Sequence, residues 1–276
     1  MEILDGKKIK MEKLEELKRE IEKLNRKLGL VVIQVGEDQA STVYVNQKNK
    51  MAEMLGYNFN HIKLPSDISE IELINVINKL NVDDNVDGIL VQMPVPKHIN
   101  AKNIQNAIIP SKDVDGLNDV NAGKLMHNVD CLIPCTPLGI MGILEYYNIS
   151  VSGKNVVIVG RSDLVGRPMA TLMLNNDATV TICHSKTNNL SDYTKNADIL
   201  IVAVGKSKMI TADMVKDGVV IIDVGMNRVD GKLCGDVDYE NVAKKASYIT
   251  PVPGGVGQMT VLALGKNVYK AYLLRK

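Results

Sequence analysis

A tyrosine and a lysine four residues apart are the first candidates for chemistry in this chain. Tyr44 and Lys48 have the spacing that places two side chains on one face of a helix. A phenol ring can stack on a flat heterocycle, and a lysine withdrawn from water can exchange a proton near neutral pH. The same pair is also typical of an ordinary exposed helix face, so it indicates catalysis only together with other residues.

Two further polar residues stand where parallel α/β sheets bind ligands. Gln92 directly follows the apolar run Gly88–Val91, so its amide is predicted at the carboxyl end of a strand. Asp115 lies in the segment KDVDG. Its carboxylate can accept two parallel hydrogen bonds from an amino-pyrimidinone edge, or it can simply belong to an Asp-Gly turn.

A loop near the C-terminus has almost no bulky side chains. Its sequence is PVPGGVG, and small residues there permit close approach of the backbone to a ligand. The residues that we expect to border a ligand are Pro253, Gly254, Gly255, Val256 and Gly257.

Another strand and turn have the features of a nucleotide site. The apolar run Val156–Val159 leads into a turn bounded by Gly160 and Gly166, and a helical pattern follows. Such a turn lets backbone N–H groups and the positive end of a helix meet a pyrophosphate. The glycine spacing is not G-x-G-x-x-G, so a tight turn without a ligand is the alternative.

The residues after the next predicted strand indicate which nucleotide binds. An NAD site usually has Asp or Glu there, holding the ribose 2′-hydroxyl, whereas this strand is followed by His184, Ser185 and Lys186. A hydroxyl near Arg161 suits a 2′-phosphate instead. NADP is therefore predicted rather than NAD, unless Ser185 and Lys186 only form a solvated loop.

The elements that position these residues alternate between helix and strand. Helical periodicity is found over Lys7–Leu28, Ala40–Leu55, Ser69–Leu80, Leu138–Tyr147, Gly166–Asn175 and Met259–Leu274. Apolar runs predict strands over Leu30–Val35, Tyr57–Leu64, Gly88–Val91, Asn155–Val159, Thr179–Cys183, Ile199–Val204 and Val219–Val224. The pattern predicts an α/β fold with two lobes and a cleft between them, an N-terminal α/β substrate domain and a Rossmann-like dinucleotide-binding domain.

Composition argues against several classes of protein. Hydrophobic residues make up 45% and charged residues 24%, and 33 basic against 32 acidic residues leave a net charge of +1, so no overall field favours nucleic acid or an anionic membrane. No segment approaches the ~20 apolar residues of a membrane span, and the N-terminus has no apolar signal region. The four cysteines lack C-x-x-C spacing, which favours reduced thiols in the cytoplasm over a metal site.

Taken together, these segments resemble the bifunctional methylenetetrahydrofolate dehydrogenase/cyclohydrolase family. The matching stretches follow the family's order and are VGEDQASTVYVNQK, GILVQMPVP, PSKDVDG, PCTP, VVIVGRSDLVGRP, ATVTICHSKT, IIDVGMNR, GDVDY and ITPVPGGVGQMT. The chain departs from the family pattern at three places. Gln258 and Ser207 stand where proline is usual or frequent, and Leu117-Asn118 replaces a common Phe-His.

The resemblance implies a two-step reaction, NADP-dependent oxidation of 5,10-methylenetetrahydrofolate to the methenyl compound and its hydrolysis to 10-formyltetrahydrofolate. Tyr44 would stack on the folate, Lys48 would be the principal catalytic group, Gln92 would assist Lys48 and Asp115 would grip the pterin ring. The substrate contacts that it implies also include Val91, Met93 and the loop Pro253–Gly257. The implied NADP contacts are Gly160, Arg161, Ser162, Ser185 and Met226.

The resemblance also implies an organisation for the chain. Residues 1–137, with the C-terminal helix 258–276, would form the folate-binding catalytic domain, and residues 138–257 would form the NADP-binding domain. A cytoplasmic homodimer joined through the nucleotide-binding lobe is expected, without a metal and without nucleic-acid or membrane partners.

Three other interpretations stay open at this point. A short-chain dehydrogenase also uses Tyr-x-x-x-Lys, but in that class the pair follows the glycine-rich turn, whereas Tyr44 precedes Gly160. A monofunctional methylenetetrahydrofolate dehydrogenase would be expected to lose the function of Lys48 or Gln92. A non-catalytic folate- or NADP-binding regulator would not be expected to retain these residues together with Asp115.

Overall fold

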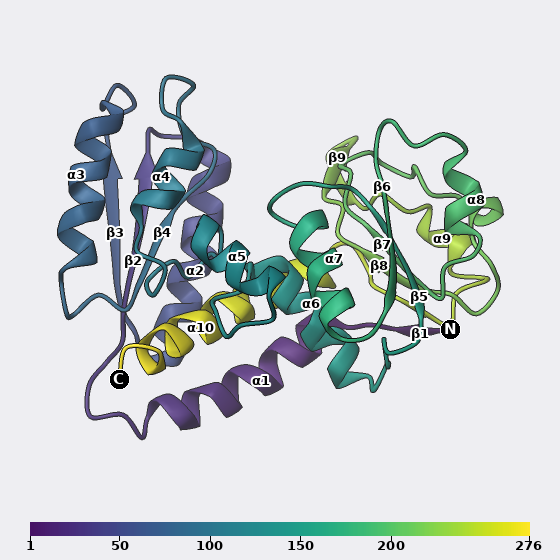
Figure 1. Cartoon of the computed structure of the whole chain (residues 1–276), viewed down its shortest axis with the longest axis horizontal. Coiled ribbons are helices and arrows are strands. Elements are labelled where there is room, and N and C mark those ends of the chain that lie inside the picture. The colour runs from purple at the N-terminus through teal and green to yellow at the C-terminus, as the bar shows by residue number, and fades with distance from the viewer. The chain divides into compact units, whose positions relative to one another are not determined.

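The chain folds into two compact units. The computed structural model describes residues 1–276, apart from the side chains of Gln39 and Ala40. One unit comprises residues 1–11 and 136–260, and the other comprises residues 12–135 and 261–276. They are named here the six-stranded unit and the three-stranded unit after their main sheets (Figure 1).

The three-stranded unit contains a short parallel sheet with helices packed on it. Its strands are β2 (Gly29–Val35), β3 (Asn58–Leu64) and β4 (Gly88–Val91), in the order β3–β2–β4. Its helices include α2 (Gln39–Leu55), α3 (Glu70–Asn81), α4 (Ala101–Ala107) and α5 (Asp119–Met126). The middle strand β2 is buried along its whole length, as expected of a parallel strand covered on both faces.

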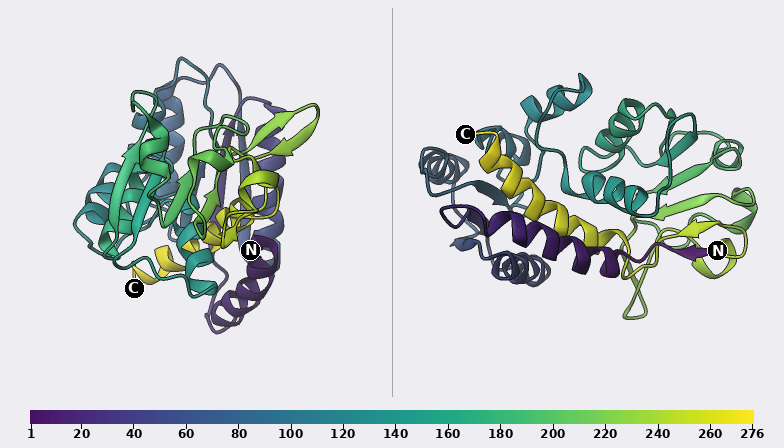
Figure 2. Two further views of the ribbon diagram at one scale, coloured as in Figure 1. Left: turned by 90° about the vertical axis from the view of Figure 1, so that its right-hand side faces the viewer. Right: turned by 90° about the horizontal axis from the view of Figure 1, so that it is seen from below.

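Caps and packing fix the helix that carries the candidate catalytic lysine. Helix α2 begins after Asp38, whose side chain accepts a hydrogen bond from the Ser41 N–H at 2.7 Å. Within the same unit, parts of α1 (Gly6–Ile21) and α10 (Val256–Leu273) lie side by side, because Gly265 leaves room for Leu17 and Leu55 (Figure 2). Helix α2 is therefore held between its sheet and the C-terminal helix.

The six-stranded unit contains a parallel sheet in the order β1–β11–β8–β7–β5–β6, in which every neighbouring pair is parallel. Its strands are β1 (Glu2–Ile3), β5 (Asn155–Val159), β6 (Thr179–Cys183), β7 (Ile199–Val202), β8 (Val220–Asp223) and β11 (Tyr248–Ile249). Its helices include α6 (Cys135–Tyr146), α7 (Gly166–Asn175), α8 (Leu190–Thr194) and α9 (Tyr239–Val242), with a 3-10 turn, η1 (Ala212–Met214). An antiparallel hairpin of β9 (Asn227–Val229) and β10 (Lys232–Cys234) stands away from the sheet (Figure 2).

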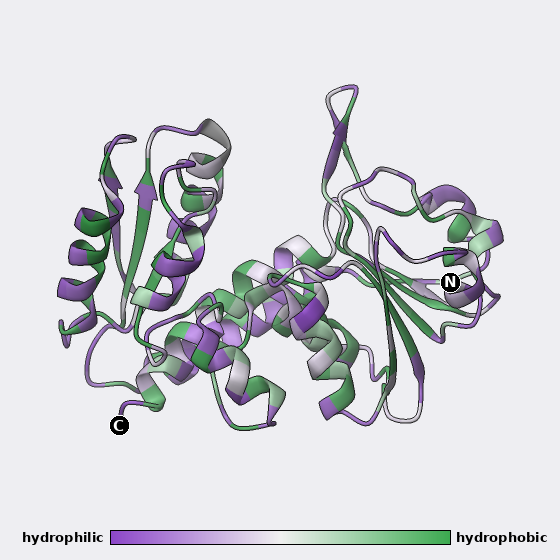
Figure 3. Cartoon of the chain, turned by 45° about the horizontal axis from the view of Figure 1, so that its top comes forward, coloured by the Kyte–Doolittle hydropathy of each residue, from purple (hydrophilic) through white to green (hydrophobic). Residues whose placement is uncertain are grey.

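The core of the six-stranded unit follows its central strands. Val157, Leu200 and Ile221 are at most 1% exposed and pack in one apolar cluster. The hydropathy colouring shows these strands as continuously apolar (Figure 3). Such runs are typical of parallel strands that are covered on both faces, and they make the sheet a rigid support for the loops at its edges.

Most predicted elements are confirmed, and two of the differences have a clear physical cause. Helix α1 ends at Ile21 instead of Leu28, because the chain bends so that Arg26 reaches the buried carboxylate of Asp87 with two hydrogen bonds of 2.7 and 2.8 Å. The sequence pattern predicted no helix between Gly88–Val91 and Leu138–Tyr147, but this stretch contains α4 and α5, which begin directly after Asn100 and Asn118. Each asparagine side chain accepts backbone N–H groups of the helix that it begins.

The N-terminus contributes to the sheet of the six-stranded unit. β1 pairs with β11 in parallel, whereas the sequence assigned residues 1–137 to the other domain. Among the residues that the structure describes, no helix has the length and apolar character needed to span a bilayer.

Candidate active site

Helix α2 and the end of β4 bring Lys48 and Gln92 together. The Lys48 ammonium donates a hydrogen bond to the Gln92 side-chain oxygen at 2.6 Å. The Gln92 amide nitrogen donates to the Met93 carbonyl at 2.8 Å, which fixes the amide with its oxygen toward Lys48. Gln92 is only 9% exposed, so the lysine is held by an acceptor that water barely reaches.

Burial changes the proton affinity of this lysine. Removal from water lowers the pKa of Lys48, and the nearby Asp115 and Cys135 act in the opposite direction. Burial also raises the pKa of the Asp115 carboxyl, against the effects of Lys48 and of a hydrogen bond with Cys135. A lowered pKa makes a lysine better able to take up and release a proton during a reaction.

Asp113 supports the turn that carries Asp115. Its carboxylate accepts hydrogen bonds from the Asn118 N–H at 2.8 Å and from the Asn121 side chain at 3.0 Å. Burial raises the pKa of Asp113 to about 6, although these hydrogen bonds lower it. These hydrogen bonds of Asp113 fix the turn, and the neighbouring Asp115 interacts with Lys48.

Two residues near this group were not predicted as functional. Cys135 lies in the PCTP motif, to which the resemblance assigns no role; it is buried and donates a hydrogen bond to the Val114 carbonyl at 3.3 Å. Burial, and secondly the charge of Asp115, raise the pKa of the Cys135 thiol well above its usual value, which keeps it protonated. The Asn267 side chain donates to the carbonyls of Val114 and Ile133, both at 2.8 Å, and nothing in the sequence marks this residue.

The remaining predicted substrate residues of this unit differ in accessibility. Tyr44 lies one helical turn before Lys48 on α2 and is 42% exposed, so its ring can be covered by a ligand. The Met93 side chain is partly exposed. The Val91 side chain belongs to the apolar core, so this residue could meet a ligand only through its backbone.

The glycine turn after β5 has space for backbone and for little else. Gly160 has a φ of +128°, and a Cβ there would lie 2.3 Å from the Ala203 carbonyl oxygen. A Cβ on Gly166 would lie 2.2 Å from the Gly160 carbonyl oxygen, and α7 begins at Gly166. Ser162 accepts a hydrogen bond from the Val165 N–H at 3.2 Å. A helix start behind a turn that begins and ends with glycine fits the pyrophosphate of a dinucleotide.

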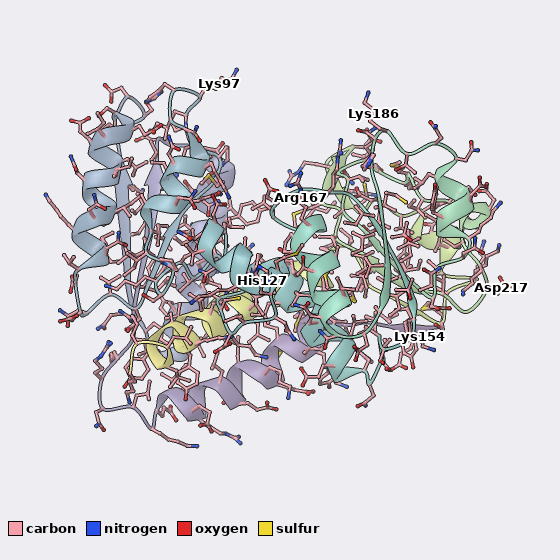
Figure 4. All side chains as sticks on the ribbon, in the orientation of Figure 1. Lys97, His127, Lys154, Arg167, Lys186 and Asp217 are labelled. Atoms are coloured by element: carbon pink, nitrogen blue, oxygen red, sulfur yellow. The ribbon has the colours of Figure 1, made fainter. Side chains whose placement is uncertain are left out.

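The turn after β6 lies at the same edge of the sheet. Val159 of β5 is paired with Cys183 of β6, so the segments that follow leave the sheet together. Ser185 and Lys186 are exposed in this turn, and Lys186 projects from the surface of its unit (Figure 4). Arg161 is exposed as well, and no carboxylate follows β6 before the next helix begins. This set suits a 2′-phosphate better than a free 2′-hydroxyl.

The glycine-rich loop belongs to the six-stranded unit. The Gly254 carbonyl accepts a hydrogen bond from the Lys7 N–H at 3.1 Å, and the Gly255 N–H donates to the Pro251 carbonyl at 2.9 Å. A Cβ on Gly257 would lie 3.5 Å from the Met226 methyl carbon. The predicted site residues therefore form two groups, with this loop and the nucleotide turns in one unit and the lysine group in the other.

Comparison with known proteins covers both parts of the chain. Residues 4–115 match the model of the tetrahydrofolate dehydrogenase/cyclohydrolase catalytic domain, and residues 134–276 match that of the NAD(P)-binding domain of the same family. The chain belongs to this family. The tetrahydrofolate dehydrogenase/cyclohydrolase assignment confirms the family predicted from the sequence, and with it the α/β fold with a Rossmann-like nucleotide domain.

Individual family members agree with this assignment. The chain is 52% identical over 276 residues to the bifunctional protein FolD of Nautilia profundicola, covering 98% of this chain and 97% of the relative. The crystal structure of the bifunctional FolD enzyme of Campylobacter jejuni superposes with a TM-score of 0.98 at 48% identity and covers 100% of both chains. The FolD structure of Trypanosoma brucei, complexed with NADP cofactor and an inhibitor, has a TM-score of 0.93 at 34% identity, covering 99% of this chain and 97% of that one.

Proposed function

We propose that this chain is a bifunctional enzyme of folate one-carbon metabolism. It oxidises 5,10-methylenetetrahydrofolate to 5,10-methenyltetrahydrofolate with NADP and hydrolyses the product to 10-formyltetrahydrofolate. The family match and the bifunctional relatives support this enzyme class and cofactor. The hydrogen bond of 2.6 Å between Lys48 and the buried Gln92 is the observation that best supports hydrolysis of the methenyl compound.

The lysine group does the proton chemistry of the second step. Hydrolysis adds water to the cationic methenyl carbon; as the carbon–nitrogen bond to the ring breaks, one of the two water protons ends on that nitrogen and the other is released to solvent. Lys48 can accept a proton from the water and pass it to the ring nitrogen, because burial lowers its pKa and Gln92 keeps its amine in place. The Asp115 carboxylate accepts hydrogen bonds from the amino-pyrimidinone edge of the pterin, and Tyr44 stacks on the ring.

The nucleotide turns hold the cofactor. NADP, when bound, supplies the hydride acceptor of the first step. Gly160 and Gly166 keep side chains away from the start of α7, so the pyrophosphate can approach the backbone and the positive end of the helix. Ser162 and Met226 border the cofactor, while Ser185 and Arg161 bind the 2′-phosphate. The loop Pro253–Gly257 borders the folate.

Domain roles, assembly and location complete the proposal. The folate-binding catalytic domain is assigned to residues 1–137 with 258–276, and the NADP-binding domain to residues 138–257. Residues 1–11 are the exception to this division, because they pack with the six-stranded unit and β1 extends its sheet. The protein forms a homodimer through the nucleotide-binding domain, a view supported by the exposed apolar side chains of Leu174 and of Ile182 on the edge strand β6. It works in the cytoplasm without a nucleic-acid partner, as supported by the free thiols of its four cysteines and its net charge of +1.

Two variants of one helix test the proposed activities. Lys48→Met removes the amine at little cost in volume, and Lys50→Met removes an exposed lysine of the same helix as a control. Product analysis is run with methylenetetrahydrofolate plus NADP⁺, and separately with methenyltetrahydrofolate alone. The wild type and Lys50→Met should form 10-formyltetrahydrofolate from both, and Lys48→Met should lose about 10²- to 10⁴-fold of the hydrolysis. Hydrolysis at the wild-type rate by Lys48→Met would refute the role given to the lysine, and a wild type that forms no NADPH would refute the dehydrogenase.

A further inference from the structure

Two carboxylates are buried at the end of β8 and after β10. Asp223, the last residue of β8, is 3% exposed, and Asp236 is 0% exposed. Among the ion pairs of the described residues, none includes either side chain. Burying a charge without a counter-ion is costly unless hydrogen bonds satisfy it, so the donors around the two groups must explain their presence.

Those donors are almost all backbone N–H groups. Asp236 accepts from the three consecutive N–H groups of Val204, Gly205 and Lys206 at 2.7, 2.9 and 2.8 Å. Its fourth donor is the Asn227 side chain at the base of the β9–β10 hairpin, at 2.9 Å. One carboxylate thus fixes the loop after β7 and the start of the hairpin together.

Asp223 in turn fixes the segment that carries Asp236. It accepts from the N–H groups of Gly225 and Asp236 at 2.9 Å each, and from that of Val237 at 3.0 Å. Burial raises the pKa of Asp223 to about 6, while these N–H groups lower it, so the carboxylate is largely ionised at neutral pH.

The two carboxylates lie so close to the backbone at Gly225 and Gly235 that neither position has room for a side chain. A Cβ on Gly225 would lie 2.3 Å from the Asp236 carboxylate, and a Cβ on Gly235 would lie 1.8 Å from that of Asp223. Both glycines occur in motifs noted in the sequence, IIDVGMNR and GDVDY, whose function the active-site residues did not explain. The motifs are therefore built around the two carboxylates.

This carboxylate pair is linked to the nucleotide turns through the segments that it holds. Ala203, which precedes the loop held by Asp236, donates its N–H to the Val159 carbonyl at 2.8 Å. Its own carbonyl oxygen occupies the space that a Cβ on Gly160 would need, at 2.3 Å. On the other side, Gly225 leads directly to Met226. Both segments that the carboxylates hold therefore border residues assigned to NADP.

We propose that Asp236, oriented by Asp223, is a positioning residue for the NADP site of this enzyme. It holds the loop Ala203–Lys206 against the Gly160 turn and keeps Met226 at the base of the hairpin. Oxidation of the folate depends on this arrangement, whereas hydrolysis of the methenyl compound, which needs no nucleotide, does not. The expected loss of folate oxidation rests on the proposed function. The affinity for NADP⁺, in contrast, can be measured by binding alone, without any turnover.

Asp236→Asn is the decisive variant, because an amide replaces acceptor positions by N–H donors that face other N–H groups. Asp217→Asn, an exposed aspartate of the same unit (Figure 4), is the matched control. NADP⁺ affinity is measured by calorimetry, alongside the KM for NADP⁺, the rate of methenyl hydrolysis and thermal unfolding. Asp236→Asn should weaken NADP⁺ binding and raise its KM by about 10- to 100-fold, the usual effect of losing hydrogen bonds to a charged group, and leave hydrolysis unchanged.

The outcomes separate the possible failures. Unchanged NADP⁺ affinity in folded Asp236→Asn overturns the inference, as does a parallel loss of binding and hydrolysis. If that variant does not fold, Asn227→Ala removes one donor and leaves the buried charge in place; a selective weakening of NADP⁺ binding then supports the inference and equal affinity overturns it. A wild type that binds NADP⁺ but does not reduce it refutes the proposed function, and the binding comparison still decides the role of Asp236.

Discussion

Two different substitutions of Gln92 should shift the pKa of Lys48 in opposite directions. Gln92→Met keeps the side-chain length but removes the oxygen that accepts the Lys48 hydrogen bond at 2.6 Å. Gln92→Glu keeps the shape and puts a negative charge in the same place. Because Gln92 is only 9% exposed, water cannot readily replace the lost acceptor in the first variant or screen the new charge in the second.

The structure sets the size of the two effects. Loss of a hydrogen bond to a charged group costs about 1.5–3 kcal/mol, which corresponds to about a 10- to 100-fold fall in kcat/KM for hydrolysis by Gln92→Met. The remaining ammonium has lost a partner, so the pKa of Lys48 should fall further. In Gln92→Glu the carboxylate still accepts the hydrogen bond and adds a negative charge; at the present contact of 2.6 Å, two unit charges attract by about 6 kcal/mol at an effective dielectric of about 20, so the pKa of Lys48 should rise.

The pH profile of methenyltetrahydrofolate hydrolysis measures both effects. The limb that reports Lys48 should move to lower pH in Gln92→Met and to higher pH in Gln92→Glu. Thermal unfolding of both variants controls for damage to the fold. If the limb moves in the same direction in both variants, or does not move, Gln92 does not tune the lysine.

Three further predictions concern Asp115, Arg161 and Asp113. Asp115→Asn replaces an acceptor by a donor and should raise the KM for folate about 10-fold without affecting the KM for NADP⁺; equal KM values for folate would remove Asp115 from the substrate site. Arg161→Gln should raise the KM for NADP⁺ by about 10- to 100-fold and leave that for NAD⁺ unchanged, whereas a parallel rise would show that Arg161 does not bind the 2′-phosphate. Burial raises the pKa of Asp113 from 3.8 to about 6, so its contribution to stability is present below the unfolded value and is lost as pH rises through about 6. Asp113→Asn should flatten this dependence by up to about 1.4 kcal/mol per pH unit in urea unfolding between these values, and slopes equal to those of the wild type would contradict the assignment.

Long periodic segments could be predicted from the sequence, and short ones could not. The strand Asn155–Val159 and the helix Gly166–Asn175 have the predicted bounds, because continuous apolar runs and the glycine turn mark them clearly. β1 and β11 each have two residues, too few for any pattern, and they exist because their backbones pair with each other. The strand predicted to reach Val204 ends at Val202, because the Val204 N–H donates to Asp236 instead.

The same distinction holds for the candidate site. Lys48 and Gln92 could be proposed as partners because each lies in a recognisable motif, and the structure brings their side chains into hydrogen-bond contact. The roles of Asn267, Asp223 and Asp236 could not be predicted, because each depends on backbone groups that are distant in the sequence and meet only in the fold.

One protein is proposed to carry out both steps, and a paired time course tests this most directly. Methylenetetrahydrofolate is supplied with NADP⁺ or with NAD⁺, and the reduced nucleotide and the methenyl compound are followed together. NADPH that forms without a matching accumulation of methenyl compound, with much less reduction of NAD⁺, is the predicted result. Stoichiometric accumulation of the methenyl compound would contradict the cyclohydrolase, no reduction of either nucleotide would contradict the dehydrogenase, and reduction of NAD⁺ alone would contradict the cofactor.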